Sequence, residues 1–291
     1  MPVGVRAFAF RGGSMRLAMV RAALLTAGFV CAGTGCDASP STYDEQICNG
    51  SQELRLAARL VGGGPQIPGG ELLSENGFLF LYVRGDCRAW VKESDSWGTV
   101  RSLDLGQERA SRLFEALELS SWHAARGIYS GGSFDAADWV LATPATRIEC
   151  RTGCAGSGVP SAVTTITARL VAQISVLADA GTPLDGAVRF LAVRDEQGRI
   201  PGPLDWPLAT PELATVAHDM DEPPTPGRGL AVTDPEDARV LRELVSSSQA
   251  TRRLYGILPV KDGAGATYDL FVRDMLPFES DAGLVALPGG D

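Results

Sequence analysis

The sequence predicts an α+β fold in which antiparallel β-hairpins form the sheet and amphipathic helices pack on it. Two observations predict this class. The run at 78–83 (FLFLYV) is strongly β-prone, and a short turn separates it from a second such run at 87–92, which is typical of a hairpin. Apolar side chains then recur at i, i+3, i+4 and i+7 within 107–119, which indicates a helix with one buried stripe.

The first half of the chain supplies most of the expected elements. Alternation and β-prone runs predict strands at 53–61, 78–83, 87–92, 100–105, 139–142 and 146–150. Helices are expected at 107–119 and 162–178, with Ala110, Leu113, Phe114 and Leu117 on the buried face of the first and Leu170, Ile174 and Leu177 on that of the second. The stretch between Trp122 and Ser133 is glycine-rich and is expected to be a loop, which either caps the first helix or lines a ligand cleft.

The second half follows a similar plan. A strand is expected at 187–193, and a hairpin at 254–260 and 266–275. Between them, Thr233 or Asp234 caps a helix whose first turn contains Pro235 and Glu236. The strand and helix after Leu230 match those after Leu103 at a constant offset of 127 residues, 230 against 103. This match predicts two similar units, at 48–182 and 183–291; the alternative is one continuous domain, because most strand–helix pairs align this well.

Residues 1–35 have the features of an export signal. They carry four arginines and no acidic residue, and an apolar run of about a dozen residues ends in small residues. That run is too short for a permanent membrane span, which needs about 20 residues. Met15 is an alternative start, which gives a signal at 15–35.

The end of this signal resembles the lipobox of bacterial lipoprotein precursors. Gly33-Thr34-Gly35-Cys36 places small residues before a cysteine, although Gly33 stands where the family usually has leucine. The resemblance implies that a lipid is attached to Cys36, that the chain is cleaved before it, and that 36–47 is a flexible tether to the membrane. Simple cleavage, which gives a secreted or periplasmic soluble protein, and an uncleaved anchor are the alternatives.

Charge narrows the range of partners. Cleavage before Cys36 removes 35 of 291 residues and leaves 256. The number of Lys and Arg falls from 26 to 22, while the 35 Asp and Glu remain, so the formal charge of the mature chain is −13. Such an acidic chain repels nucleic acid phosphates, so no nucleic acid partner is expected. A protein or polymer ligand of the cell envelope fits better.

Four cysteines remain in the mature chain: Cys48, Cys87, Cys150 and Cys154. An even number in an exported protein predicts disulfides, and four cysteines allow three pairings. A local clip from Cys150 to Cys154 is feasible, since it encloses only three residues, and it leaves Cys48 to pair with Cys87. A metal site formed by Cys150, Cys154 and a histidine is the weaker alternative, because the cysteine pair lacks the two-residue spacing of zinc knuckles.

The search for catalytic motifs gives little. The sequence contains no HExxH helix, no GxSxG elbow, no phosphate-binding GxxxxGK[ST] loop and no GxGxxG, so neither a cofactor nor a metal is expected. The cluster at 218–222 (HDMDE) is either a Ca²⁺ site or, more simply, an acidic surface loop.

Two functions follow from these observations. The first is a membrane-tethered, non-enzymatic bacterial lipoprotein that binds an envelope component or assists envelope assembly. The second is an exported hydrolase in which His123 or His218 acts beside residues distant in the sequence.

Overall fold

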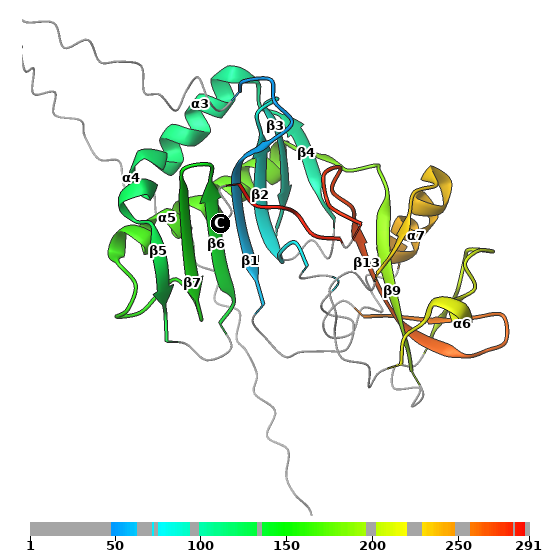
Figure 1. Ribbon diagram of the computed structural model, residues 1–291. Coiled ribbons are helices and arrows are strands. Elements are labelled where there is room, and N and C mark those ends of the chain that lie inside the picture. The colour runs from blue at the N-terminus through cyan, green and yellow to red at the C-terminus, as the bar shows by residue number, and fades with distance from the viewer. Residues whose placement is uncertain are drawn as a thin grey trace, which may run out of the picture. The chain divides into compact units, whose positions relative to one another are not determined.

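The computed structural model divides the chain into a leading segment, Met1–Ser39, and one compact unit, Pro40–Asp291. The structure describes residues 48–62, 72, 75–93, 99–132, 136–195, 202–219, 229–247, 257–281 and 283–288, all of which belong to the compact unit. Helices and mostly antiparallel sheets occur together in it, so the predicted α+β class is confirmed (Figure 1).

The first sheet has eight strands in the order β5-β7-β6-β1-β2-β3-β4-β8. They are β1 (Leu54–Val61), β2 (Leu79–Arg84), β3 (Arg88–Lys92), β4 (Arg101–Asp104), β5 (Gly127–Ser130), β6 (Asp138–Thr143), β7 (Thr146–Arg151) and β8 (Thr182–Pro183). All neighbours are antiparallel except β5 and β7. The predicted hairpins are β2–β3 and β6–β7, and β1 joins them because it pairs with both β2 and β6.

Three helices pack on one face of this sheet: α3 (Gly106–Leu117), α4 (Leu119–Ala124) and α5 (Ser161–Ala180). The residues predicted to face the core are buried there, namely Ala110, Leu113, Phe114 and Leu117 in α3 and Leu170, Ile174 and Leu177 in α5. Side chains alternate along each strand, so Leu56 and Ala58 face these helices while Ala57 faces the opposite side. By length and composition α5 is apolar enough to span a membrane, yet its buried face belongs to this core.

The opposite face of the first sheet is covered by the chain after β13. We call the described residues 276–281 and 283–288 the C-terminal strap. Its apolar residues pack over the sheet residues Ala57, Phe80, Tyr82, Trp90 and Ala142. Figure 1 shows the two layers: α5 runs behind the sheet and the red strap crosses in front of β1 and β2.

The second sheet has five strands in the order β10-β12-β13-β9-β11. They are β9 (Val188–Arg194), β10 (Leu204–Asp205), β11 (Leu230–Val232), β12 (Leu258–Lys261) and β13 (Thr267–Asp274). Two helices, α6 (Leu213–Val216) and α7 (Pro235–Ser247), contribute Leu213, Ala238 and Leu241 to its core. Asp234 caps α7, since its Oδ1 accepts hydrogen bonds from the backbone N–H groups of Glu236 (3.0 Å) and Asp237 (3.1 Å).

The two sheets share a local order but not a topology. In each, a strand pair is followed by a helix and then a hairpin: β3, β4, α3 and β6–β7 in one, and β9, β11, α7 and β12–β13 in the other. The hairpins join in opposite senses. In the β6–β7 hairpin the first strand, β6, lies nearer the centre of its sheet. In the β12–β13 hairpin the second strand, β13, lies nearer the centre. The strand order therefore does not repeat.

The stretch expected to be a loop after the first helix is ordered differently. Glu118 adopts a left-handed conformation (φ 48°) and ends α3, and α4 and β5 follow instead of the loop. Trp122 explains the extra helix: it is fully buried, and its indole N–H donates to the Leu117 carbonyl at 3.1 Å. The strand forms because 127–130 pairs with β7, a long-range contact that a local pattern cannot reveal.

Candidate functional site

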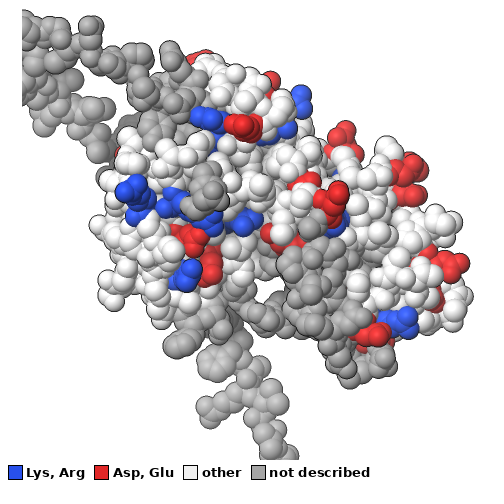
Figure 2. Space-filling model, in the orientation of Figure 1, with Lys and Arg blue, Asp and Glu red and all other residues white. Residues whose placement is uncertain are grey.

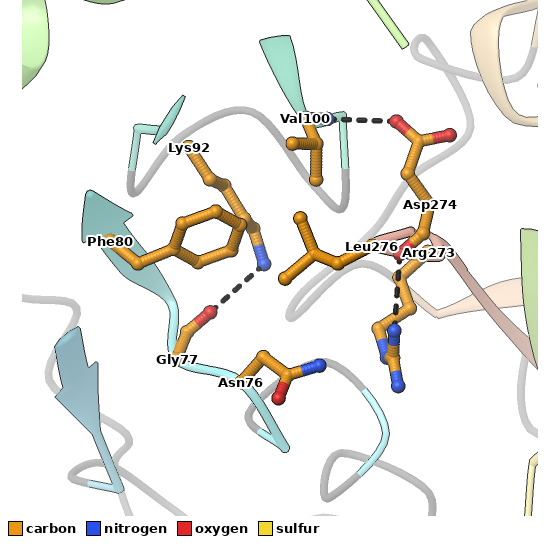
Figure 3. A pocket seen from close by; sticks show the side chains of 8 residues that line it. All are labelled: Asn76, Gly77, Phe80, Lys92, Val100, Arg273, Asp274 and Leu276. Carbon is orange, nitrogen blue, oxygen red and sulfur yellow. Dashed lines mark hydrogen bonds between the residues drawn. The ribbon is translucent and has the colours of Figure 1, made fainter. Parts of the chain in front are cut away.

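A group of charged side chains is buried between the first sheet and the end of β13; Figure 3 shows three of them, Lys92, Arg273 and Asp274. Its members, which we call the buried charge cluster, are the basic side chains of Lys92, Arg189 and Arg273 and the carboxylates of Glu75, Asp274 and Glu279. Each side chain is at most 6% exposed. Buried charge is costly unless it is paired, so we take this cluster as the candidate functional site.

Arg273 is the centre of this cluster. Its guanidinium pairs with Glu75 (Nη2 to Oε2, 2.6 Å) and with Glu279 (Nη1 to Oε2, 2.8 Å), and its Nε donates to the Leu72 carbonyl at 2.9 Å. Burial alone would lower the pKa of Arg273, but the carboxylates of Glu279 and Glu75 outweigh it and raise that pKa. Arg273 therefore stays charged.

Arg189 extends the cluster across β9. Its Nη1 donates to the Gly229 carbonyl at 2.7 Å, its Nη2 donates to the Asp281 carbonyl at 3.0 Å, and its Nε lies 3.4 Å from Oε1 of Glu279. Gly229 leaves space for this arrangement, because a Cβ there would lie only 2.7 Å from Cγ of Arg189. Arg189 thus links the second sheet to the C-terminal strap.

Asp274 links three segments. Its Oδ2 accepts from the Val100 backbone N–H at 2.8 Å, and its Oδ1 accepts from Nε of Arg242 on α7 at 2.7 Å. Burial raises the pKa of Asp274, while Arg242 and the Val100 N–H oppose that shift. The segment that leads into β4 and the second sheet are therefore joined through one carboxylate.

Lys92 lies at the end of β3, with its Nζ 3.3 Å from the Gly77 carbonyl. Burial lowers the pKa of Lys92 to about 7; the positive charge of Arg273 adds to the effect and Asp274 opposes it. Figure 3 shows Lys92, Asn76, Leu276 and Asp274 around one small cavity. Tyr82 lies beside the cluster, and burial raises the pKa of its hydroxyl to about 12.

The size of the cavity limits what this site can do. Its volume is about 10 Å³, which suits a single water molecule, whereas ligand sites usually measure about 300–1,000 Å³. A substrate does not fit. The cluster instead connects the two sheets and the strap through buried ion pairs and hydrogen bonds.

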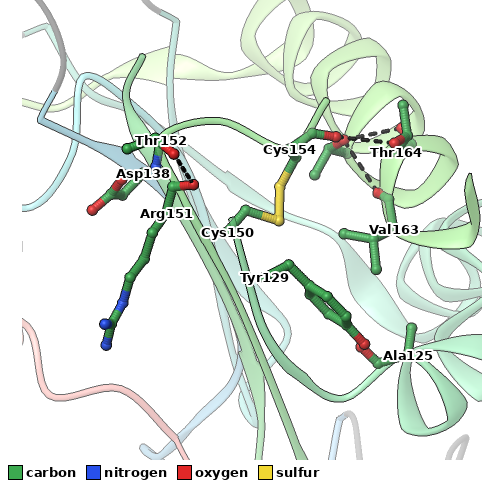
Figure 4. The surroundings of a disulfide bond; sticks show 10 residues. Ala125, Tyr129, Asp138, Cys150, Arg151, Thr152, Cys154, Val163 and Thr164 are labelled. Atoms are coloured by element: carbon green, nitrogen blue, oxygen red, sulfur yellow. Dashed lines mark hydrogen bonds between the residues drawn. A yellow bond between two sulfur atoms is a disulfide. The ribbon is translucent and has the colours of Figure 1, made fainter. Parts of the chain in front are cut away.

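The predicted disulfide bonding is confirmed. Cys48 is joined to Cys87 over a separation of 39 residues, and Cys150 to Cys154 over 4, with Cα–Cα distances of 5.0 and 5.2 Å. The second bond closes the turn between β7 and α5 (Figure 4). There the Cys154 carbonyl accepts a hydrogen bond from Oγ1 of Thr164 at 3.0 Å, so the clip also fixes the first turn of α5.

The two histidines occupy different surroundings. His123 is exposed on α4, and its Nδ1 lies 3.4 Å from the hydroxyl of Thr146. His218 is placed by its backbone, which pairs with β9: its N–H donates to Ala192 at 2.9 Å and its carbonyl accepts from Arg194 at 2.9 Å. In the described part of the chain no carboxylate contact completes a Ser-His-Asp arrangement around His123.

The remaining predicted sites fall largely outside the described residues. Cys36 and the tether at 36–47 lie outside them, as do Met220, Asp221 and Glu222 of the acidic cluster. Asp219 is described, and it forms an exposed ion pair with Arg194 at 3.3 Å.

Sequence reasoning missed the buried charge cluster, although a signal was present. Lys92, Arg189, Arg273 and Asp274 are charged residues that interrupt or end apolar β-runs. A charge in such a run indicates either an exposed face or a paired buried one, and only the fold decides between them.

Comparison with known proteins adds no further constraint: no family model matches the chain, and neither a curated protein nor a solved structure matches it.

Proposed function

We propose that the chain is an exported bacterial lipoprotein, tethered to a membrane through Cys36, whose compact unit is a non-enzymatic binding or assembly module of the cell envelope. The observation that carries the proposal is the pair of disulfides in the compact unit. Disulfides persist in oxidising compartments and are rare in the cytosol. The export-like front end and the small residues before Cys36 provide the route to such a compartment.

The site supports binding more than catalysis. Arg273, Glu75 and Glu279 pair with one another, and the small cavity beside them has no room for a substrate. The ligand of this proposal therefore binds outside the buried charge cluster. Figure 2 shows that the coloured side chains around α6 and α7 are mostly acidic, which favours a cationic or hydrogen-bonding partner over an anionic one.

The test is the intact mass of the membrane-associated protein, made in a bacterium from the full chain. The expected product begins at Cys36, carries an added acyl mass on that residue, and gains four daltons on full reduction. Cys36→Ser should abolish the acyl mass and move the protein to the soluble fraction. Cys31→Ser is the matched control and should change neither result.

Contrary outcomes are equally specific. A product that retains residues 1–35 without acyl mass contradicts lipidation. Four free thiols in the compact unit of the freshly isolated protein contradict export to an oxidising compartment.

A further inference from the structure

The C-terminal strap is held to the first sheet by polar bonds as well as by apolar packing. Asn76 donates from Nδ2 to the Gly283 carbonyl (3.0 Å) and accepts at Oδ1 from the Val285 N–H (2.9 Å). Glu279 accepts from the Leu276 N–H at 3.1 Å while it pairs with Arg273. The attachment of the strap therefore depends on the buried charge cluster.

The strap covers an aromatic surface. Phe278 packs edge-on against Trp90, with ring centroids 4.8 Å apart, and against Tyr82 at 5.9 Å. Trp90 and Tyr82 are each at most 2% exposed. If the strap opened, these rings on β2 and β3 would become accessible to solvent.

Lys92 lies beneath the strap at the cavity. Phe80, Lys92, Arg273 and Asp274, which line the cavity, belong to strands, whereas Leu276 of the strap lies outside any strand, as do the lining residues Asn76, Gly77 and Val100. Opening at Leu276 breaks no strand ladder, so it lets water reach the ammonium group while both sheets stay intact.

We propose that the C-terminal strap is a pH-responsive clasp: protonation of Lys92 within the closed cluster favours the open strap, which uncovers the aromatic face of the first sheet.

The charged surroundings of Lys92 set the direction of the response. Arg273 and Asp274 on β13 are the charged groups that act directly on Lys92. The other charged or titratable groups of the surrounding network are Glu75, Glu279 of the strap, Arg189 of β9, Arg242 of α7, Arg59 of β1 and Tyr82 of β2. Added positive charge at Lys92 is opposed by burial and by Arg273, and Asp274 compensates only in part. The closed state therefore binds this proton weakly.

The size of the response follows from linkage. The pKa of Lys92 is about 7 in the closed state, and an exposed lysine has a pKa of about 10.4. The open state binds the proton more tightly, so the open-to-closed ratio rises as pH falls from about 10 to about 7 and levels off below that. Between pH 8 and pH 6 the expected rise is about tenfold.

The test is hydrogen–deuterium exchange of the mature chain, measured by mass spectrometry at pH 8 and pH 6 and corrected for the intrinsic exchange rate. Peptides from the strap should show about a tenfold larger opening constant at pH 6. Peptides from β1, which lies in the middle of the first sheet, should not change. Lys92→Met should abolish the pH dependence in the strap, while Lys261→Met, which alters a lysine on β12 that is 42% exposed, should preserve it.

Three results would overturn the proposal: strap exchange that is independent of pH after correction, an unchanged pH dependence in Lys92→Met, or a rise of the same size in β1, which would indicate global unfolding. Leu276→Ala gives an independent check because it leaves Lys92 in place. That variant should raise strap opening at both pH values and keep the roughly tenfold ratio between them; loss of the ratio would also contradict the proposal.

Discussion

The two sheets of the compact unit are stabilised by different means. Among the described residues, the core between the first sheet and its helices has 27 buried members, whereas that of the second sheet has 13. The first sheet also contains both disulfides. The second sheet is joined to the rest of the chain by the buried ion pairs of Arg189 and Arg273 and by the hydrogen bond from the Val100 N–H to Asp274.

Charge separates the two regions as well. Residues 48–183 contain 12 Lys and Arg against 14 Asp and Glu, whereas residues 184–291 contain 10 against 18. The excess acid of the second region lies largely outside the buried charge cluster, where three basic side chains face three carboxylates. The comparison teaches that charge is balanced inside the buried charge cluster, whereas the acidic excess of the second region lies outside it.

Removal of Arg273 should have the largest effect on this comparison. Arg273→Ala leaves Glu75 and Glu279 without their shared guanidinium, and breaking a buried pair in this way costs about 3–5 kcal/mol of unfolding free energy. Urea unfolding followed by circular dichroism would measure it. Arg239→Ala is the matched control: Arg239 pairs with Glu236 and Glu243 on the exposed side of α7, so its loss should lie within experimental error. Equal losses for the two variants would show that the cluster does not hold the second sheet.

The two disulfides should differ in their contribution to the first sheet. In the chain-entropy model, the bond between Cys48 and Cys87 contributes about 4 kcal/mol and the shorter Cys150–Cys154 clip about 2 kcal/mol. Pairwise replacement of each bond by alanine, followed by thermal unfolding, would measure the difference. A larger loss for the clip would show that its contacts with α5 matter more than loop length.

The smallest expected effect concerns the helix of the second sheet. Asp234→Ala removes the cap of α7 and should lower the unfolding free energy by about 1 kcal/mol. Thr233→Ala changes the neighbouring residue, which the sequence leaves as an equal candidate for the cap, and should cost much less. The reverse order would assign the cap to Thr233. Chemical denaturation of both variants would decide.

Local patterns predicted most of the fold. The apolar stripe of α3, the β2–β3 hairpin and the start of α7 each depend on neighbouring residues, and all three are present where expected. Long-range pairing was not predictable, because β5 forms only where β7 lies beside it. The end of α3 was not predictable either, because Glu118 adopts a left-handed backbone conformation that is uncommon for glutamate.

The candidate site was beyond sequence reasoning for the same reason. Asn76 and Val285 are far apart in the chain, as are Arg273 and Glu75, yet they share hydrogen bonds in the fold. The cysteines were different, because four of them allow only three pairings and the short spacing between Cys150 and Cys154 makes a local bond feasible.

The bond between Cys48 and Cys87 has a mechanical consequence. Any tension applied along the chain from before residue 48 reaches this covalent link ahead of β1 and is divided between two points, the start of β1 and the turn between β2 and β3. To peel β1 away, a pulling force would first have to drag the tip of a neighbouring hairpin with it, so the sheet resists being unravelled from its front.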